Sequence, residues 1–564
     1  MPLKNLIALA FKDVFPETEK LPIETLISDI STVNSLEILG YFNAQLHTIE
    51  QDTSKQIEFL KIWTNRFPKD IIQKLISFVQ KFEGKQNANF VFINNVSSLM
   101  LIEQVLKFHN NIKPVDNITP EQELQLFKAY LICSQQWTDD QMKAYSGEKI
   151  DNPDSFINLL LPIHLPFQEI LEFKDFRLQF IKAVYFFKFC ESNMYFSKFL
   201  EHFLKKYTLD SWQTYLINII SIYVRKFEPL KIPSVLKVGS EYPQIRSFLD
   251  NLSINTETFQ IKNDFLSLRE NPVCKVDNET YIFLNLNFLV DKIFQGIQFD
   301  FANILINRGT LYKGKLIKIF SDFKNAYAEQ FSENGLFFRV MDYAFEYSKY
   351  IKFDGNQLKK SLGDGFPDYY IRDKSKVYIF EYKDVLLNAD IKQSYSIDSI
   401  KSEISKKLII NEKGSAKGIT QLINYIEKIR NNEFQKIDNY DFTRVTIYPI
   451  LVYTDFSFNL SGINFFLNSE FLKLLGQKNI SNSHLIKDVV MIDIDTFIKF
   501  QDLFRDKRLR INDCLNDFYN VTGNKNKPYD SVIPFNMFIH NKTLKIDYAS
   551  PKMLEDELGE MMPK

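Results

Sequence analysis

Residues 366–383 read FPDYYIRDKSKVYIFEYK, and this stretch contains two runs rich in β-forming side chains. The first run is Phe366–Arg372 and the second is Val377–Lys383. The four residues Asp373–Lys376 between them are polar or charged and have the length of a hairpin loop. The stretch therefore predicts an antiparallel β-hairpin.

The register of this hairpin decides which side chains meet. A loop of this length places Arg372 opposite Val377, and the same register places Asp368 opposite Glu381. A slip of one residue would place Asp368 opposite Phe380 and turn the aspartate to the other face. We expect the first register, with two carboxylates on one face.

Two carboxylates and an ammonium group on one face suit the hydrolysis of a phosphodiester. Strand alternation puts Glu381 and Lys383 on the same face of their strand. A hard cation such as Mg²⁺ or Mn²⁺ prefers carboxylates and water as ligands and supplies hydroxide near neutral pH. Asp368 and Glu381 are therefore the expected metal ligands. Lys383 is expected to orient the attacking water and to stabilise charge.

Two predicted helices flank the hairpin. The first runs from Leu316 to Phe331, ends at Asn334-Gly335 and carries Glu329, a third carboxylate for a second metal or for positioning water. Asp322 and Glu333 lie on the same or adjoining turns, which leaves the choice among the three acids open.

The second helix runs from Lys417 to Arg430 and carries Gln421 and Tyr425 four residues apart, so both are expected to reach one phosphate or metal-bound water. Its apolar face consists of Ile419, Leu422, Ile423, Ile426 and Ile429.

The region after residue 265 predicts a mixed α/β domain. Its order is helix, strand, strand, helix, strand, and Val445–Tyr453 and Val489–Ile494 are further strand candidates. We expect a mixed central sheet flanked by helices. The predicted domain covers residues 266–500, with its core at 315–455, and residues 501–564 form an extension that packs on it.

The first 265 residues predict a mainly α-helical region with a recognition or regulatory role. Apolar residues recur at three- and four-residue steps, as at Phe180, Ile181, Val184 and Phe187. The pattern changes at residues 273–284, which read as two strands joined by an Asp-Asn-Glu turn.

The composition of the 564 residues is that of a folded globular protein with a net charge of −1. No global field draws the chain to nucleic acid, so any such binding needs a local basic surface. The four cysteines are too far apart for a zinc site and are expected to be reduced, buried thiols in a cytoplasmic protein. No apolar run has the length of a membrane span, so no membrane partner is expected.

Together, these motifs resemble the PD-(D/E)XK nuclease superfamily, whose fold is restriction-endonuclease-like. The branch that fits carries a Q-x-x-x-Y helix and includes recombination exonucleases and helicase-coupled nucleases. The resemblance covers the region from about 300 to 500. It implies that six residues are catalytic, with the first three binding metal: Asp368, Glu381, Glu329, Lys383, Gln421 and Tyr425.

One departure from the family pattern is an insertion of about 35 residues between Lys383 and Gln421. Its lysines outnumber its acids, so it either contacts a nucleic-acid backbone or forms a solvated, charged helix pair. The lysines are Lys392, Lys401, Lys406, Lys407, Lys413 and Lys417. The densest basic stretch, residues 505–510, reads more readily as an exposed helix face than as a DNA contact.

Simpler explanations exist for each motif. An E-x-K triplet is common by chance: Glu172-Phe173-Lys174 follows Pro153-Asp154 in a segment with helical periodicity. Glu381 and Lys383 could be a structural ion pair at a sheet edge. Gln421 could lie on the surface, Tyr425 could be a half-buried packing residue, and Glu329 could be solvated.

The resemblance implies a Mg²⁺- or Mn²⁺-dependent nuclease that hydrolyses DNA, with a role in defence against foreign DNA. The chain has no G-x-x-x-x-G-K-[ST] loop, so a partner protein would have to supply any nucleotide-driven motor or activation. The alternatives are a nuclease that acts on RNA and a catalytically inactive nucleic-acid-binding or scaffold protein that keeps the fold.

Overall fold

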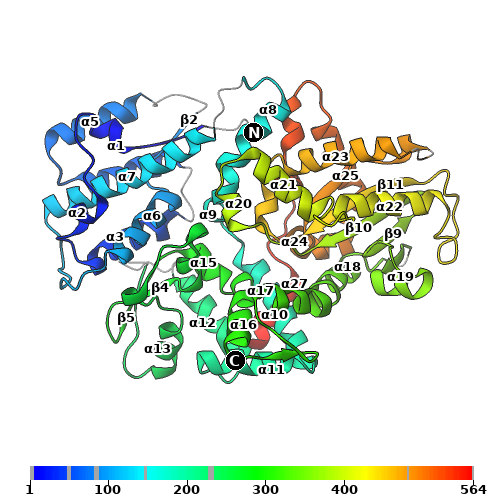
Figure 1. Ribbon diagram of the computed structural model, residues 1–564, viewed down its shortest axis with the longest axis horizontal. Helices are drawn as coiled ribbons and strands as arrows, with labels where there is room; N and C mark the ends of the chain where they lie inside the picture. Colours follow the sequence, from blue (N-terminus) through cyan, green and yellow to red (C-terminus); the bar gives the residue numbers. More distant parts are fainter. Residues whose placement is uncertain are drawn as a thin grey trace. The chain divides into compact units, whose positions relative to one another are not determined.

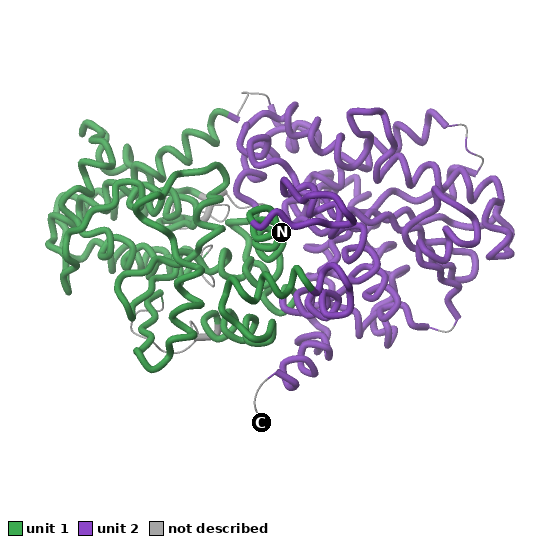
Figure 2. Tube along the Cα trace, turned by 60° about the horizontal axis from the view of Figure 1, so that its bottom comes forward, with its two compact units in different colours: residues 1–143, 169–179, 198–307 green, residues 144–168, 180–197, 308–564 purple. Residues whose placement is uncertain are grey.

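The computed structural model describes residues 5–46, 52–81, 88–144, 149–225, 234–347, 349–478, 480 and 482–561. The chain forms two compact units, each assembled from separate segments (Figure 2). Unit 1 consists of residues 1–143, 169–179 and 198–307, and unit 2 of residues 144–168, 180–197 and 308–564. These limits differ from the predicted boundary at residue 265, because residues 266–307 group with the N-terminal part and residues 144–168 and 180–197 group with the sheet. Residues 501–564 belong to the same unit as the sheet.

Unit 2 is mixed α/β and is built on a five-stranded mixed sheet (Figure 1). The strand order is β12-β11-β10-β9-β8; β9 is antiparallel to both of its neighbours, β8 and β10, whereas β10, β11 and β12 are parallel. The strands are β8 (Ile351–Asp354), β9 (Tyr369–Asp373), β10 (Lys376–Lys383), β11 (Thr446–Tyr453) and β12 (Val490–Asp493).

The hairpin of β9 and β10 has the predicted register. Arg372 pairs with Val377, and the ladder continues to the pair of Tyr369 with Phe380. The strands predicted at 445–453 and 489–494 are confirmed as β11 and β12. The short strand β8 was not predicted, because its four residues are all only half-buried and lack an alternating pattern.

One face of β10 packs against the predicted amphipathic helix. Val377 and Ile379 share a buried cluster with Ile419, Leu422 and Ile426 of α22 (Gly418–Arg430). Four-residue spacing on the helix and two-residue spacing on the strand bring these apolar stripes together. The same cluster includes side chains from α8 (Pro153–His164), α21 (Ile397–Leu408) and α23 (Ile463–Gln477).

The other face of β10 is aromatic. The Phe380 ring lies 6.2 Å from that of Phe497 in α24 (Ile494–Arg505), and Tyr382 stacks on Phe337 at 4.6 Å. Both faces of β10 are therefore covered, and it is the middle strand of the sheet. A pair of charged side chains on β10 does not lie on an edge strand.

The helix before the hairpin is longer than predicted. It begins as α17 (Phe320–Tyr327), widens into a π-helix, η4 (Ala328–Phe337), and continues as α18 (Phe338–Ala344). The expected stop at Asn334-Gly335 was wrong, because Gly335 is buried inside the π-helix and Phe337 and Phe338 pack on the sheet beyond it. Leu316 lies not in the helix but in β7 (Lys315–Leu316), which pairs with β6 (Leu311–Tyr312).

Unit 1 is mainly helical. The predicted strand pair at residues 273–284 is confirmed as β4 (Val273–Lys275) and β5 (Thr280–Phe283), which join β3 (Val235–Lys237) in a small sheet. The strands β1 (Asn5–Ala8) and β2 (Ala88–Val91) pair in parallel. The longer helices are α3 (Thr32–Leu46), α4 (Thr53–Thr64), α5 (Lys69–Gln80), α6 (Asn95–Lys107), α7 (Pro120–Lys143), α12 (Trp212–Arg225), α13 (Pro243–Asp250) and α16 (Gln295–Asn307).

Other helices complete the chain. The helices α10 (Phe176–Ser192) and α11 (Phe196–Tyr207) cross the limits between the two units. Unit 2 also contains α19 (Gly355–Leu362), α20 (Ala389–Lys392), α25 (Ile511–Thr522), α26 (Phe535–Thr543) and α27 (Lys552–Met561).

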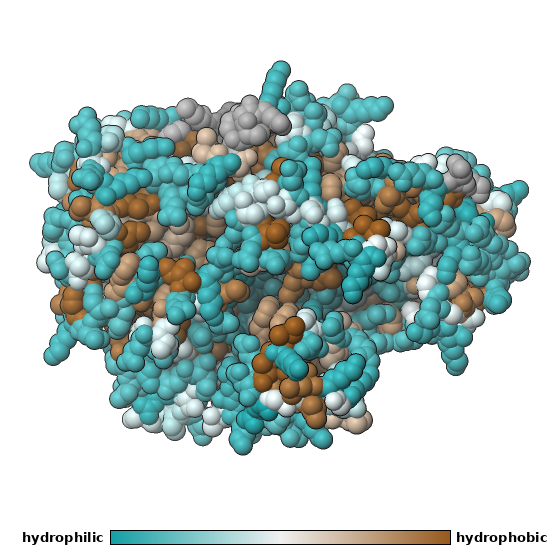
Figure 3. Space-filling view, viewed as in Figure 1, coloured by the Kyte–Doolittle hydropathy of each residue, from teal (hydrophilic) through white to brown (hydrophobic). Residues whose placement is uncertain are grey.

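Figure 3 shows the hydropathy of one face of the molecule. The face drawn in Figure 3 is mostly hydrophilic, and its hydrophobic residues lie in small groups. In the described part of the chain no helix combines the length and the hydropathy needed to cross a bilayer. All four cysteines are free and buried, as predicted.

Candidate active site

The open end of the hairpin brings the two predicted carboxylates together. Asp368 lies one residue before β9, and its Oδ2 accepts a hydrogen bond of 2.7 Å from the backbone N–H of Tyr382. This bond ties Asp368 beside Glu381, the residue that the register places opposite it. The alternative register, with Asp368 opposite Phe380, does not occur.

Glu381 is held by two side chains at once. It is 1% exposed; its Oε1 accepts a hydrogen bond from the Lys383 ammonium, and its Oε2 accepts one of 2.8 Å from the hydroxyl of Tyr425. Gln421 in turn donates a hydrogen bond of 3.4 Å from Nε2 to the Tyr425 hydroxyl. Both residues of the Q-x-x-x-Y pair therefore lie on the side of α22 that faces Glu381.

The third carboxylate near the site is Glu333 and not Glu329. The carboxylate of Glu329 is exposed and bonded to Lys313 and to the hydroxyl of Tyr312 in the neighbouring β6–β7 hairpin. Glu333, one helical turn later, is close enough to Asp368 and Glu381 to raise the pKa of Asp368 and to have its own pKa raised by Glu381. Positions four residues apart share a helix face, so the sequence pattern alone does not show whether Glu329 or Glu333 lies at the site.

A glycine makes room for Glu333. A Cβ atom at Gly355, the first residue of α19, would lie 3.3 Å from Oε1 of Glu333 and 3.3 Å from the backbone oxygen of Asp368. Such contacts are tighter than ordinary van der Waals distance. Gly355 was not predicted as a residue of the site. The sequence marks it only by its position directly after Asp354, the N-cap of α19.

The electrostatics of the site favour a bound cation. Burial raises the pKa of Asp368 well above its ordinary value, and the nearby charges of Glu381 and Glu333 raise it further. Burial also raises the pKa of Glu333, with Glu381 adding to the effect. Burial alone would lower the pKa of Lys383, but Glu381 and Asp368 outweigh it and raise that pKa, so the side chain stays charged. Three carboxylates thus surround one ammonium group.

A hydrogen-bond network on the opposite face of β10 supports the site. The buried carboxylate of Asp384 accepts hydrogen bonds of 2.7 Å from Lys324, 2.6 Å from Ser332 and 2.7 Å from Thr454. Ser332 also lies 3.0 Å from the hydroxyl of Tyr382. These bonds fix the π-helix that carries Glu333 to the strand that carries Glu381. Burial opposes the charge of Asp384, but Lys324, Ser332 and Thr454 outweigh it and lower the pKa of that carboxyl.

The side chains present fit a divalent cation that keeps much of its water. Glu333 forms no hydrogen bond or ion pair within the described residues, and Asp368 uses only one oxygen. Within residues 5–561 as described, no group of three or more His, Cys, Asp or Glu side chains is arranged to hold a metal ion. Mg²⁺ commonly binds through one or two carboxylates and several waters. Asp368 and Glu381 match that requirement.

The lysines of the insertion are largely occupied by neighbours. Lys406 pairs with Glu412 at 3.0 Å, Lys407 pairs with Glu403 at 3.6 Å, and Lys401 donates to Asn158 at 2.7 Å. These contacts favour the reading of this segment as a charged, solvated helix pair. The other E-x-K triplet, Glu172-Phe173-Lys174, is not arranged like Glu381 and Lys383, because Lys174 is buried and pairs with Asp291 at 2.5 Å in unit 1.

Comparison with known proteins gives no assignment: no family model, no curated protein and no solved structure matches the chain significantly. The geometry of the site and the sequence resemblance are therefore the basis for proposing a function.

Proposed function

We propose that the chain is a metal-dependent nuclease that hydrolyses phosphodiester bonds at the open end of the β9–β10 hairpin. One observation carries the proposal: Asp368 from just before β9, Lys383 from β10 and Tyr425 from α22 all lie at Glu381. A structural ion pair would need only Glu381 and Lys383. The hydrogen-bonded tyrosine and the two further carboxylates have no role in such a pair.

Each residue has a distinct task in this proposal. Asp368 and Glu381 would hold a Mg²⁺ or Mn²⁺ ion, which when bound supplies positive charge to the phosphate and lowers the pKa of its water. Lys383 stays protonated and would stabilise negative charge on the phosphate and orient the water. Tyr425 fixes Oε2 of Glu381, and Glu333 adds negative charge beside the pair.

Gln421 has a buried side-chain oxygen without a hydrogen-bond donor among the described residues. Its Nε2 bonds to Tyr425, whereas its buried Oε1 accepts no hydrogen bond within the described residues. A buried acceptor without a partner is costly, so a donor from water or substrate is expected there. Gln421 would thus position substrate or water next to Glu381.

DNA is the proposed substrate, because the resemblance is to nucleases of recombination and helicase-coupled systems. Defence against foreign DNA is the proposed role, by analogy with stand-alone, multi-domain nucleases of this class. RNA is the alternative substrate. In the remaining alternative, the chain binds nucleic acid without cutting it.

The proposal is tested by incubating the purified full chain with linear, circular and single-stranded DNA and with RNA, in Mg²⁺ or in EDTA. We expect cleavage of DNA in Mg²⁺ and none in EDTA. Asp368→Ala and Lys383→Ala should abolish cleavage, whereas Glu329→Gln, which alters a carboxylate outside the site, should cut like wild type.

Other outcomes would point elsewhere. Cleavage of RNA alone would change the substrate but keep the site. Cleavage retained in both Asp368→Ala and Lys383→Ala would show that the site is misplaced. Metal-independent binding of DNA with no cleavage of any substrate would favour the non-catalytic alternative.

A further inference from the structure

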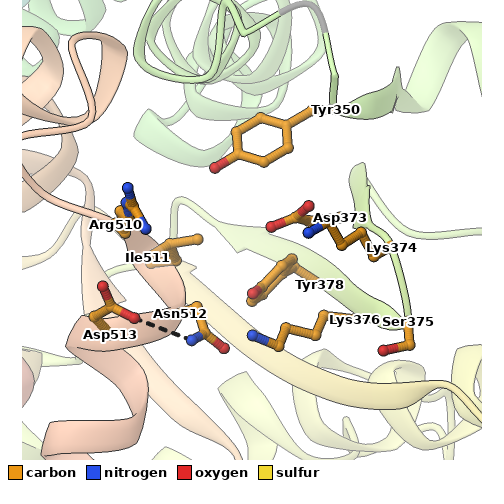
Figure 4. Close-up of a pocket in the computed structure, with 10 residues that line it drawn as sticks. All are labelled: Tyr350, Asp373, Lys374, Ser375, Lys376, Tyr378, Arg510, Ile511, Asn512 and Asp513. Carbon is orange, nitrogen blue, oxygen red and sulfur yellow. Dashed lines mark hydrogen bonds between the residues drawn. The ribbon is translucent and has the colours of Figure 1, made fainter.

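A second pocket lies at the opposite end of the same hairpin (Figure 4). It has a volume of about 280 Å³ and is lined by the β9–β10 turn, the start of β10, Tyr350 and the start of α25. Lys376 and Glu381 lie five residues apart on β10, which corresponds to about 17 Å along a strand. The pocket is therefore distinct from the carboxylate site.

The pocket contains three cations without acidic partners. Lys374, Lys376 and Arg510 form no ion pair within the described residues, although Asp373 and Asp513 also line the pocket. By contrast, Arg505 and Arg508 of the same basic stretch are bonded to Asp506 and to the backbone oxygen of Asp547. Counting the five charged side chains, the lining has one more positive than negative charge.

The start of α25 adds hydrogen-bond donors. Arg510 is its N-cap residue, and its side chain makes no capping bond. The first turn of a helix leaves backbone N–H groups without intrahelical partners and carries a partial positive charge. Phosphate groups bind readily at such positions.

A buried hydroxyl group without a partner also faces this pocket. Tyr378 is 1% exposed, lines the pocket, and its hydroxyl forms no hydrogen bond within the described residues. Its ring stacks on Tyr448 at 4.9 Å, which fixes the hydroxyl in place. Figure 4 shows Tyr378 between Asp373 and the α25 residues Asn512 and Asp513. A buried hydroxyl without a partner costs stability unless a ligand or water satisfies it.

We propose that this pocket binds a small molecule that carries a phosphate group, of the size of a mononucleotide. Arg510, Lys376 and the first turn of α25 would bind the phosphate, and Tyr378 would donate its hydroxyl hydrogen to a phosphate oxygen. Asp373 and Asp513 would accept hydrogen bonds from hydroxyl or amino groups elsewhere on the ligand. The volume is at the small end of ligand pockets, which fits a single phosphorylated unit rather than a polymer.

The test is calorimetric titration of the full chain with inorganic phosphate, adenosine 5′-monophosphate and adenosine. This measurement does not depend on cleavage, so it stands apart from the proposed nuclease activity. We expect the monophosphate to bind most tightly, inorganic phosphate more weakly, and adenosine not at all. No saturable binding of either phosphate compound up to about 10 mM would overturn the proposal.

Matched variants sharpen the test. Arg510→Gln should weaken binding about tenfold or more, whereas Arg444→Gln, which alters an arginine with an 86% exposed side chain outside the pocket, should bind like wild type. Tyr378→Phe should weaken binding about fivefold, the effect of one lost hydrogen bond, yet leave the ligand-free protein at least as thermally stable as wild type. Unchanged binding by both pocket variants would contradict the assignment.

Discussion

Among single residues, Glu333 and Glu329 give the sharpest test of the proposed site, because only Glu333 lies near its carboxylates. Glu333 influences the pKa of Asp368, whereas Glu329 is bonded to Lys313 away from the site. We expect Glu333→Gln to weaken Mg²⁺ activation of cleavage about tenfold, because removing a charge near a partly exposed ion costs on the order of 1–3 kcal/mol. The measurement is the Mg²⁺ dependence of the cleavage rate.

Glu329→Gln is the matched control, with the same chemical change four residues earlier. It should leave the Mg²⁺ dependence within about twofold of wild type, a difference of well under 1 kcal/mol. The assignment of Glu333 would be wrong if the two variants showed equal Mg²⁺ dependence.

A buried glutamate in unit 1 predicts a pH dependence of stability. Glu103 in α6 is buried, its Oε1 accepts no hydrogen bond within the described residues, and burial raises its pKa to about 8. The unfolded chain releases this proton near the ordinary value of 4.5. Between these values the folded protein binds more protons, so its stability falls as pH rises and levels off above about pH 8.

Glu103→Gln should remove the fall in stability with rising pH that Glu103 causes. Urea unfolding at about pH 5 and about pH 8 should show a variant that is more stable than wild type by a few kcal/mol at the higher pH, with a smaller difference at the lower pH. An identical pH slope for both proteins would contradict a protonated Glu103 in the folded state.

At the scale of the elements, the position of α22 depends on its first residue. A Cβ atom at Gly418 would lie 2.6 Å from the backbone oxygen of Leu408 and 3.1 Å from Leu451 on β11. Gly418→Ala should therefore shift the helix that carries Gln421 and Tyr425. We expect a loss of about 1–3 kcal/mol in unfolding free energy and a lower cleavage rate.

Gly476→Ala is the control for this change. Gly476 lies in α23 and has nothing within 4 Å of its Cβ position, so alanine should leave activity unchanged and stabilise the helix by up to about 1 kcal/mol. Equal effects of the two alanines on cleavage would argue against the close approach at Gly418.

The elements around the site were predictable where their signals were local. Two β-rich runs on either side of a polar segment predicted the hairpin and its register, although the turn is Lys374-Ser375 and not the expected four residues, because Asp373 pairs with Lys376. The isoleucine face of 417–430 predicted the helix that covers the hairpin. The π-helix and the choice of Glu333 over Glu329 were not predictable in this way, because the bonds of Ser332 and Lys324 to Asp384 join distant parts of the chain.

At the scale of the whole molecule, the core of unit 2 includes a helix from far upstream. Ile157, Leu161 and Leu165, from α8 and the turn after it, belong to the same buried cluster as Val377 and Ile379 of β10. A contiguous domain starting at residue 266 would lack these side chains. Such a non-local contribution has no signature in sequence periodicity, because packing partners are not encoded by spacing.

Leu161→Ala tests this contribution. Leu161 is fully buried, so truncation should cost about 2–5 kcal/mol in the unfolding free energy of unit 2 and lower the temperature at which nuclease activity is lost. Leu472→Ala, which alters a leucine on α23 that is 47% exposed, should cost well under half as much. Similar losses for both variants would show that α8 is not part of the core.

The proposed reaction needs a cation that Asp368 and Glu381 bind together. Anomalous scattering from crystals soaked in Mn²⁺ tests this binding most directly, because manganese is located by its own signal. We predict one Mn²⁺ peak in contact with carboxylate oxygens of both Asp368 and Glu381, and its loss in crystals of Asp368→Ala. Full Mn²⁺-dependent cleavage in solution with no peak at these two residues would show that Asp368 and Glu381 do not form the metal site.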